Sequence, residues 1–359
     1  MIGIYLHIPF CKSRCKYCDF FSTTQLERRE EYVQALLQEI DERVPNNTDI
    51  ATIYFGGGTP SLLEKEQTER LLTALLNKSA TRPTEITLEA NPGDLTFEKL
   101  QALRQIGINR LSIGIQSFDD SQLTFLGRRH NADQARQAVR DAQKAGFDNI
   151  SIDLIYALPG ETITTWQRDI DEALKLNIQH ISCYCLSYEP GTPLTQQLES
   201  GTLVHTDEET ENTMFDELCA RLKTNGFEHY EVSNFALPGK HAQHNSSYWN
   251  DTPYIGLGAG AHSYDGRTRR WNIADLAAYV KRVLSHSTYW EEETLTDEQK
   301  NIEHIMLGLR TSHGIKLTDN LRTKAQPMIA SGLLTDKNGQ LIATQSGLHI
   351  LNRIIEQLI

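Results

Sequence analysis

Three cysteines stand within eight residues near the start of the chain, at Cys11, Cys15 and Cys18. A structural zinc site needs four ligands, whereas a [4Fe-4S] cluster held by three cysteines keeps one iron free for another ligand. The spacing therefore favours a cluster with an open iron. Two alternatives stay open at this point: zinc completed by His7 or another histidine, and one disulfide with a spare thiol. No apolar secretory segment precedes the cysteines, which favours metal over a disulfide.

Length and charge narrow the class of protein. The chain has 359 residues, with 35 Lys and Arg against 47 Asp and Glu, so the net charge is −12. Acidic and basic residues are interspersed, which argues against nucleic acid or an anionic membrane as the main partner. No apolar stretch reaches the roughly 18 to 20 residues of a membrane span. We expect a soluble, cytoplasmic protein of two domains.

Short β-branched runs alternate with segments of helical periodicity, which is typical of parallel βα units. The expected strands are Ile2–Ile8, Ile50–Phe55, Glu85–Glu89, Arg110–Gln116, Asn149–Ile155 and His180–Leu186. The expected helices are Glu27–Arg43, Lys65–Lys78, Phe97–Ile106, Ala132–Ala145 and Thr164–Leu176. This order predicts an α/β fold, a partial (β/α)6 TIM-like barrel with functional groups at the carboxyl ends of its strands.

Polar segments follow these strands. They are Gly56-Gly57-Gly58-Thr59-Pro60, Glu89-Ala90-Asn91-Pro92, Gln116-Ser117-Phe118, and Asp153 ahead of Leu158-Pro159-Gly160. A glycine triplet lets backbone amides approach a ligand closely, although it is also an ordinary turn sequence. A carboxylate at a barrel mouth suits a cationic or hydroxyl-bearing ligand, although it also serves as a strand-end cap. Together these segments predict a binding site at the barrel mouth.

The motif Cys11-x3-Cys15-x2-Cys18, with the aromatic Tyr17 just before the last cysteine, resembles the signature of the radical S-adenosylmethionine (SAM) superfamily. The resemblance implies a [4Fe-4S] cluster on the three cysteines, whose open iron binds the amino and carboxylate groups of SAM. In that superfamily, reduction of the cluster splits SAM to a deoxyadenosyl radical. The resemblance thus also implies a possible electron donor as a partner.

From Ile2 to the C-terminus, the series of motifs resembles the oxygen-independent coproporphyrinogen III oxidase family. That resemblance implies that Gly57, Gly58 and Thr59 hold the methionine end of SAM, and it leaves Arg129 as a competitor for the role of its neighbour Arg128. The full set of implied SAM contacts is Tyr5, Tyr17, Gly57, Gly58, Thr59, Glu89, Gln116, Arg128 and Asp153.

Two departures from the oxidases point to another branch of the family. The oxidases carry a further cysteine two residues after the last cluster cysteine, where this chain has Phe20. They also have a substantial extension before the cluster, whereas here the first cluster cysteine is Cys11. Both departures resemble the heme chaperone branch, HemW. Oxidative decarboxylation of coproporphyrinogen III to protoporphyrinogen IX, or another radical reaction on a tetrapyrrole, stays an alternative, so enzymatic activity is left open.

The run His244-Asn245-Ser246-Ser247-Tyr248-Trp249 strengthens the resemblance to HemW, where a His-Asn-x-x-Tyr-Trp motif is tied to heme binding. It implies that His244 ligates the heme iron, with Asn245, Tyr248 and Trp249 beside the macrocycle. An imidazole is a good axial ligand, and aromatic rings can stack on the macrocycle. A histidine beside aromatic residues is also commonly a hydrogen-bonded core residue.

Other residues compete for these roles. His241 and His262 are rival ligands of heme iron. Cys183, Cys185 and Cys219 could extend the metal site, but free cysteines are among the most commonly buried residues. We expect these three thiols to be packed in the interior.

Three regions are expected along the chain: a radical SAM barrel over residues 1–235, a heme-motif connecting region packed on it over 236–290, and a small C-terminal domain over 291–359. The C-terminal domain resembles that of the oxidase family and is expected to be mostly helical and winged-helix-like. Its acids and bases nearly balance, so it is not expected to bind DNA. The sequence therefore predicts a heme chaperone that passes heme to an unidentified acceptor protein. A homodimer is a further expectation.

Overall fold

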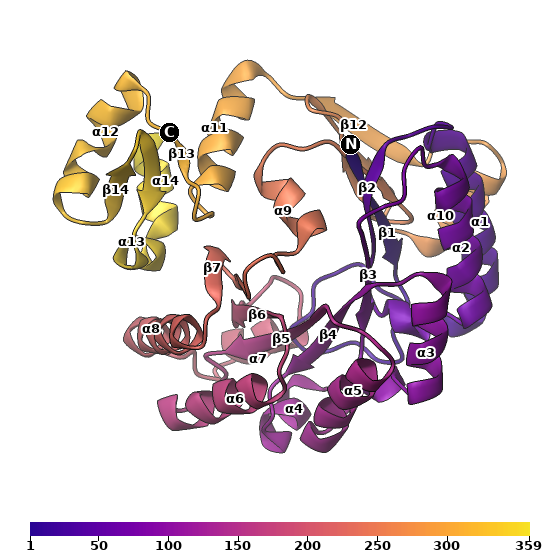
Figure 1. The fold of residues 1–359 in the computed structure, drawn as a ribbon, viewed down its shortest axis with the longest axis horizontal. Helices are drawn as coiled ribbons and strands as arrows, with labels where there is room; N and C mark the ends of the chain where they lie inside the picture. The colour runs from indigo at the N-terminus through magenta and orange to yellow at the C-terminus, as the bar shows by residue number, and fades with distance from the viewer.

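The computed structural model describes residues 1–359, and a curved sheet of twelve strands dominates it (Figure 1). The strand order is β12-β11-β10-β9-β1-β2-β3-β4-β5-β6-β8-β7. The strands β1 to β6 are parallel to one another and confirm the six strands that the sequence predicts. They are β1 Ile2–Ile8, β2 Ile50–Gly57, β3 Glu85–Ala90, β4 Arg110–Gln116, β5 Ile150–Tyr156 and β6 His180–Cys185.

Helices cover the convex side of these strands (Figure 1). They are α1 Arg29–Arg43, α2 Lys65–Lys78, α3 Phe97–Ile106, α4 Asp120–Leu126, α5 Ala132–Lys144 and α6 Ile163–Lys175, with the 3-10 turns η1 Leu26–Arg28, η2 Pro60–Leu62 and η3 Pro92–Asp94. Side-chain caps stabilise the first turns of several of these helices. At α3, the Thr96 side chain accepts a hydrogen bond from the amide of Lys99, and at α6 the Thr162 side chain accepts one from the amide of Thr165. Gly107 ends α3 with φ +117°, a conformation that a side chain would strain.

The alternation of side chains along each strand separates a hydrophobic layer from a polar interior. On β4, Leu111, Ile113 and Ile115 belong to the main hydrophobic core. The alternate residues Ser112 and Gln116 point to the opposite, concave face. The core therefore lies between sheet and helices, while the concave face of the sheet is available for a polar ligand.

Further strands extend both ends of the sheet. Beyond β1 lie β9 Tyr254–Leu257, β10 His262–Tyr264, β11 Thr268–Asn272 and β12 Trp290–Thr294, and beyond β6 lie β8 Asn234–Ala236 and β7 Glu228–Glu231. The helices of this part are α7 Pro193–Glu199, α8 Glu208–Thr224, α9 Gln243–Trp249 and α10 Leu276–Leu284. β9 and β10 approach each other closely, because a Cβ on Gly256 would lie 1.9 Å from the carbonyl oxygen of His262. The pairing of β12 with β11 continues the sheet past residue 290.

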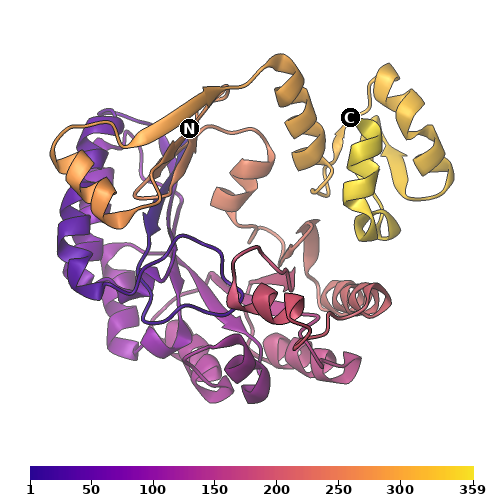
Figure 2. The same cartoon turned by 180° about the vertical axis from the view of Figure 1, so that it is seen from behind.

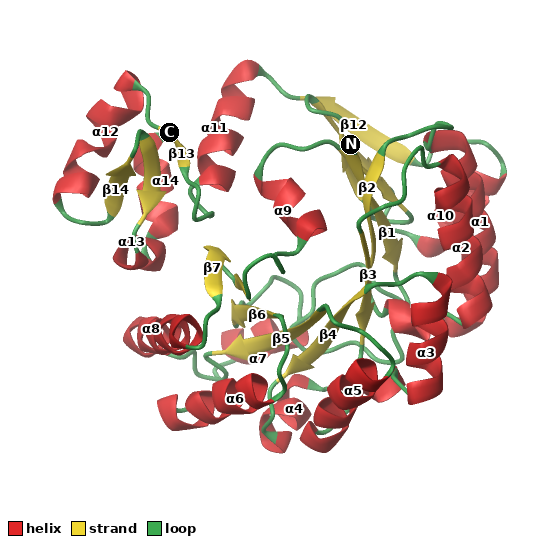
Figure 3. Cartoon of the chain, in the orientation of Figure 1, coloured by secondary structure: helices red, strands yellow, loops and turns green.

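The C-terminal region forms a separate small unit (Figure 3). Its elements are α11 Asp297–Gly308, β13 Ile315–Lys316, α12 Asp319–Ala330, β14 Leu334–Lys337, β15 Gln340–Ala343, α13 Gln345–His349 and α14 Leu351–Leu358. The three strands form their own antiparallel sheet over a core of 13 buried residues. Ile350 separates the last two helices, α13 and α14. No helix in the structure combines the length and apolarity needed to cross a membrane.

Candidate cluster and cofactor site

A cavity of about 520 Å³ opens at the carboxyl ends of the parallel strands, where the sequence predicts a site. Its volume lies in the range of small-molecule sites. Eleven of the predicted cluster and SAM residues line it: Cys11, Cys15, Tyr17, Cys18, Gly57, Gly58, Thr59, Glu89, Gln116, Arg128 and Asp153. Tyr5 does not line it, because its hydroxyl lies deeper on β1 and bonds to His7 Nδ1 at 3.1 Å.

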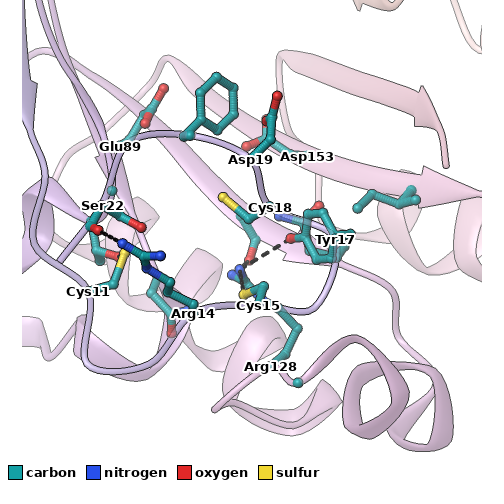
Figure 4. A pocket seen from close by; sticks show the side chains of 18 of the residues that line it. Cys11, Arg14, Cys15, Tyr17, Cys18, Asp19, Ser22, Glu89, Arg128 and Asp153 are labelled. Atoms are coloured by element: carbon teal, nitrogen blue, oxygen red, sulfur yellow. Dashed lines mark hydrogen bonds between the residues drawn. The ribbon is translucent and has the colours of Figure 1, made fainter. Parts of the chain in front are cut away.

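The three cysteines lie on the segment that follows β1, which crosses the open end of the sheet (Figures 2 and 4). All three thiols are free and half-buried. Backbone bonds hold this segment, from the Lys16 amide to the Leu126 oxygen at 3.1 Å and from the Leu194 amide to the Lys16 oxygen at 3.0 Å.

The thiols fit a cluster better than a single ion. No group of three His, Cys, Asp and Glu side chains converges closely enough for one metal ion. A [4Fe-4S] cluster instead presents separate irons to separate thiolates, so it suits three thiols that line one cavity. Burial raises the pKa of the Cys18 thiol to about 11, so ligation has to displace a proton.

The glycine loop after β2 is shaped by close contacts. Gly57 has φ +108°, and a Cβ there would lie 2.7 Å from the ring of His7. A Cβ on Gly58 would lie 2.8 Å from the carbonyl carbon of Pro9. The Gly57 amide donates to Glu89 Oε2 at 3.1 Å. The loop is therefore fixed against both the cysteine segment and the carboxylate at the end of β3.

Two buried carboxylates face the cavity. Glu89 also accepts a hydrogen bond from the Tyr54 hydroxyl at 2.7 Å, and burial raises its pKa to about 7. Asp153 accepts from the Ser112 hydroxyl at 3.2 Å, and burial raises its pKa as well. Two carboxyl groups in one cavity can neutralise a cationic group of a ligand and accept hydrogen bonds from hydroxyl groups of the same ligand.

Arg128 and its neighbour Arg129 have different partners. Arg128 Nη1 lies 3.4 Å from Cys15 Sγ and 3.5 Å from the Tyr17 hydroxyl. Arg129 instead forms an ion pair with Asp94 at 2.9 Å. Both guanidinium groups line the cavity, but only Arg128 has a cysteine sulfur and the Tyr17 hydroxyl as its partners.

The heme motif lies on the short helix α9, at the opposite end of the strands. The His244 side chain is 0% exposed, and its Nδ1 and Nε2 are 2.8 Å from Thr52 Oγ1 and the Tyr248 hydroxyl. Its ring also stacks on Tyr54, with 5.1 Å between centroids. Asn245, Tyr248 and Trp249 are half-buried on the same helix. In this arrangement neither nitrogen of His244 is free to ligate iron.

Comparison with known proteins identifies the family. Residues 5–173 match the Radical SAM superfamily. The chain is 37% identical to the heme chaperone HemW of Bacillus subtilis over 88% of this chain and 85% of that protein. It is 36% identical to the heme chaperone HemW of Escherichia coli over 99% of this chain and 97% of that protein. The chain belongs to the HemW family.

The solved structure of coproporphyrinogen III oxidase (HemN) from Escherichia coli shares the HemW-family fold seen here. The TM-score is 0.85 at 23% identity, covering 99% of this chain and 89% of that one. This likeness confirms the α/β fold with its parallel sheet. Membership of the radical SAM superfamily implies a [4Fe-4S] cluster and SAM, and the thiols and carboxylates at the cavity are chemically suited to both.

The rival heme ligands of this HemW-family chain have other surroundings. His241 Nε2 pairs with the carboxylate of Glu228 at 2.8 Å, and His262 is exposed on β10 beside Trp271. His262 is therefore accessible as the structure stands, whereas His244 is not.

Two lining residues of the cavity, Ser112 and Tyr184, were not among the predicted site residues. Asn91, from the polar segment after β3, also lines it. Ser112 and Tyr184 lie on predicted strands, so the alternation of side chains could have indicated the concave face for them. Cys183 and Cys219 are buried, as predicted, whereas the half-buried Cys185 lines the cavity, because it is the last residue of β6.

Proposed function

We propose that this chain is a heme chaperone that binds heme and transfers it to an acceptor protein. The observation that carries the proposal is the identity of 36% to 37% with proteins named as heme chaperones, over nearly the whole chain. The sequence at position 20 supports it further. Phe20 replaces the cysteine of the oxidases, and its side chain is 66% exposed at the cavity. A phenyl group there cannot ligate metal or supply a thiol for porphyrinogen oxidation.

In the proposed arrangement, Cys11, Cys15 and Cys18 hold the cluster, which supplies an open iron for SAM and draws on an electron donor. Arg128 places a positive charge beside the Cys15 sulfur. Glu89, Asp153 and the other predicted cofactor residues bind SAM, and Tyr5 supports them from the layer beneath. The SAM centre then acts on heme transfer and not on a porphyrinogen substrate. Self-association of the chain is also proposed, and sedimentation measures it directly.

The proposed heme site is His244 with Asn245, Tyr248 and Trp249. Because both imidazole nitrogens are hydrogen-bonded and the ring is buried, iron can reach His244 only when α9 separates from β2. The helix has only seven residues, so its separation need not disturb the rest of the sheet. In the arrangement described here, α9 is packed against the sheet and the ring of His244 is covered.

An anaerobic heme titration tests the heme site directly. We expect the cluster-reconstituted protein to give a saturable, one-to-one Soret band, and we expect His244→Ala to weaken heme binding at least tenfold because the axial ligand is lost. His262→Ala is the matched control and should bind like the native chain. Absence of specific heme binding would contradict the proposal, as would anaerobic production of protoporphyrinogen by the reconstituted protein. A loss of heme affinity in His262→Ala but not in His244→Ala would instead identify His262, on β10, as the ligand of the heme iron.

The pH dependence of SAM binding tests the role of Glu89. Its pKa is raised to about 7 by burial, so the carboxylate that attracts a cationic amino group forms as pH rises through that value. We expect SAM affinity, measured by equilibrium dialysis, to increase severalfold between about pH 6 and 8. Glu89→Gln should bind more weakly and lose this dependence. An unchanged pH profile in Glu89→Gln would assign the titration to another group.

A further inference from the structure

The floor of the barrel holds a buried guanidinium group without a partner. Arg110, the first residue of β4, is 1% exposed, and its Nε and Nη1 have no hydrogen-bond partner. Burial of an unpaired charge is strongly unfavourable, so such a group is expected to have a ligand or ordered water. Neighbouring side chains share this property, since Thr87 Oγ1 and Asn149 Oδ1 are also buried and unpartnered.

These three residues lie close together in the register of the sheet. Thr87 pairs with Arg110 in the parallel ladder, so both side chains point to the same face. Asn149 directly precedes Ile150, which pairs with Leu111, the residue after Arg110. A guanidinium and a hydroxyl on the same face of the sheet form a pair of donors that suits a carboxylate.

The internal carboxylates do not satisfy Arg110. Glu89 and Asp153 lie close enough for its charge to lower their pKa values, but burial outweighs this effect and raises both, and neither accepts a hydrogen bond from it. Glu85 is occupied by the backbone amides of Gln243 and His244, at 2.9 and 3.0 Å. A carboxylate from outside the chain would therefore find the guanidinium available.

The segment that carries the heme motif covers this site. Lys240 Nζ bonds to the oxygen of Asp148 at 3.0 Å, beside Asn149, and the His244 amide bonds to Glu85 at the start of β3. Arg110 begins β4, the strand between β3 and β5, so it lies between these two attachments. Separation of the segment from the sheet would expose Arg110 and His244 together.

We infer that Arg110, with Thr87, binds a carboxylate beneath this segment, and that the carboxylate is a propionate of heme. The inference rests on the proposed heme function and adds to it a second protein contact with heme, besides the one from His244. Heme carries its propionates at one edge of the macrocycle, so one molecule can present iron to His244 and a carboxylate to Arg110. A guanidinium can hold that carboxylate with two parallel hydrogen bonds.

Esterified heme tests the inference in the full-length, cluster-reconstituted protein. Ferric heme and its dimethyl ester are titrated in one detergent-containing buffer against the native chain, Arg110→Met, Arg110→Lys and the surface control Arg104→Met. The native chain and Arg104→Met are expected to bind heme at least tenfold more tightly than the ester. Arg110→Met should bind both at the level of the ester, and Arg110→Lys should keep part of the preference.

Each result has a distinct meaning. Equal binding of heme and ester by the native chain, or an undiminished preference in Arg110→Met, overturns the inference and leaves the heme function standing. No binding of heme by the native chain overturns the proposed function and this inference with it. If acetate raises the melting temperature of the native chain but not of Arg110→Met, while the ester binds like heme, the site takes free small carboxylates and the propionate assignment is wrong. The comparison of heme with ester in the native chain stands even if Arg110→Met does not fold.

Discussion

Replacement of any one of Cys11, Cys15 and Cys18 with alanine is expected to abolish assembly of the [4Fe-4S] cluster. Each thiol lines the same cavity, and no other cysteine lies on the segment after β1. Loss of one of three protein ligands leaves two irons without a protein ligand, since the open iron already lacks one. Iron and sulfide content, together with visible absorbance after anaerobic reconstitution, measures the result.

Cys185→Ala is the matched control for these variants. Its thiol also lines the cavity and is half-buried, but it lies at the end of β6 and outside the motif. We expect this variant to hold a full complement of iron and sulfide. Full iron in Cys15→Ala, loss of iron in Cys185→Ala, or stoichiometric zinc in place of iron in the native protein would each contradict the assignment of the cluster ligands.

The sequence could predict the mouth of the barrel because two local rules suffice there. Hydrophobic periodicity locates the parallel strands, and parallel strands bring their carboxyl ends to one edge. Glu89, Gln116 and Asp153 therefore meet in one cavity although they come from three different strands. The different partners of Arg128 and Arg129 could not be predicted, because only the fold shows that Asp94 lies beside Arg129.

The floor of the barrel could not be predicted in the same way. The burial of His244 depends on how a seven-residue helix packs against Thr52, 192 positions earlier in the chain. In the sequence, Arg110 is an ordinary first residue of a strand. Only the structure shows that the segment carrying α9 covers it. The short strands that extend the sheet beyond β1 were missed for a related reason. The sequence of β12 is Trp-Glu-Glu-Glu-Thr, which has a low intrinsic preference for strand. Its pairing with β11 determines its conformation.

Glu85→Ala is expected to release α9 from the sheet. The buried carboxylate accepts from the amides of Gln243 and His244, at 2.9 and 3.0 Å, and thereby fixes the start of the helix. Loss of two charge-assisted bonds costs about 3 kcal/mol or more, and about 1.4 kcal/mol corresponds to a tenfold change. Amide hydrogen exchange over residues 243–249 should therefore accelerate about a hundredfold. Exchange in β4 should stay slow, which separates local opening from global unfolding.

The same variant decides whether closure of α9 limits heme binding. If heme binds only the open state, its apparent dissociation constant equals the intrinsic one divided by the open fraction. Glu85→Ala should then bind heme up to about a hundredfold more tightly, even though it is less stable. Asp207→Ala, which removes the side-chain cap of α8, is the control and should leave heme affinity unchanged. Faster exchange in α9 without a gain in heme affinity would show that heme reaches the chain without opening this helix, and would favour an accessible ligand such as His262.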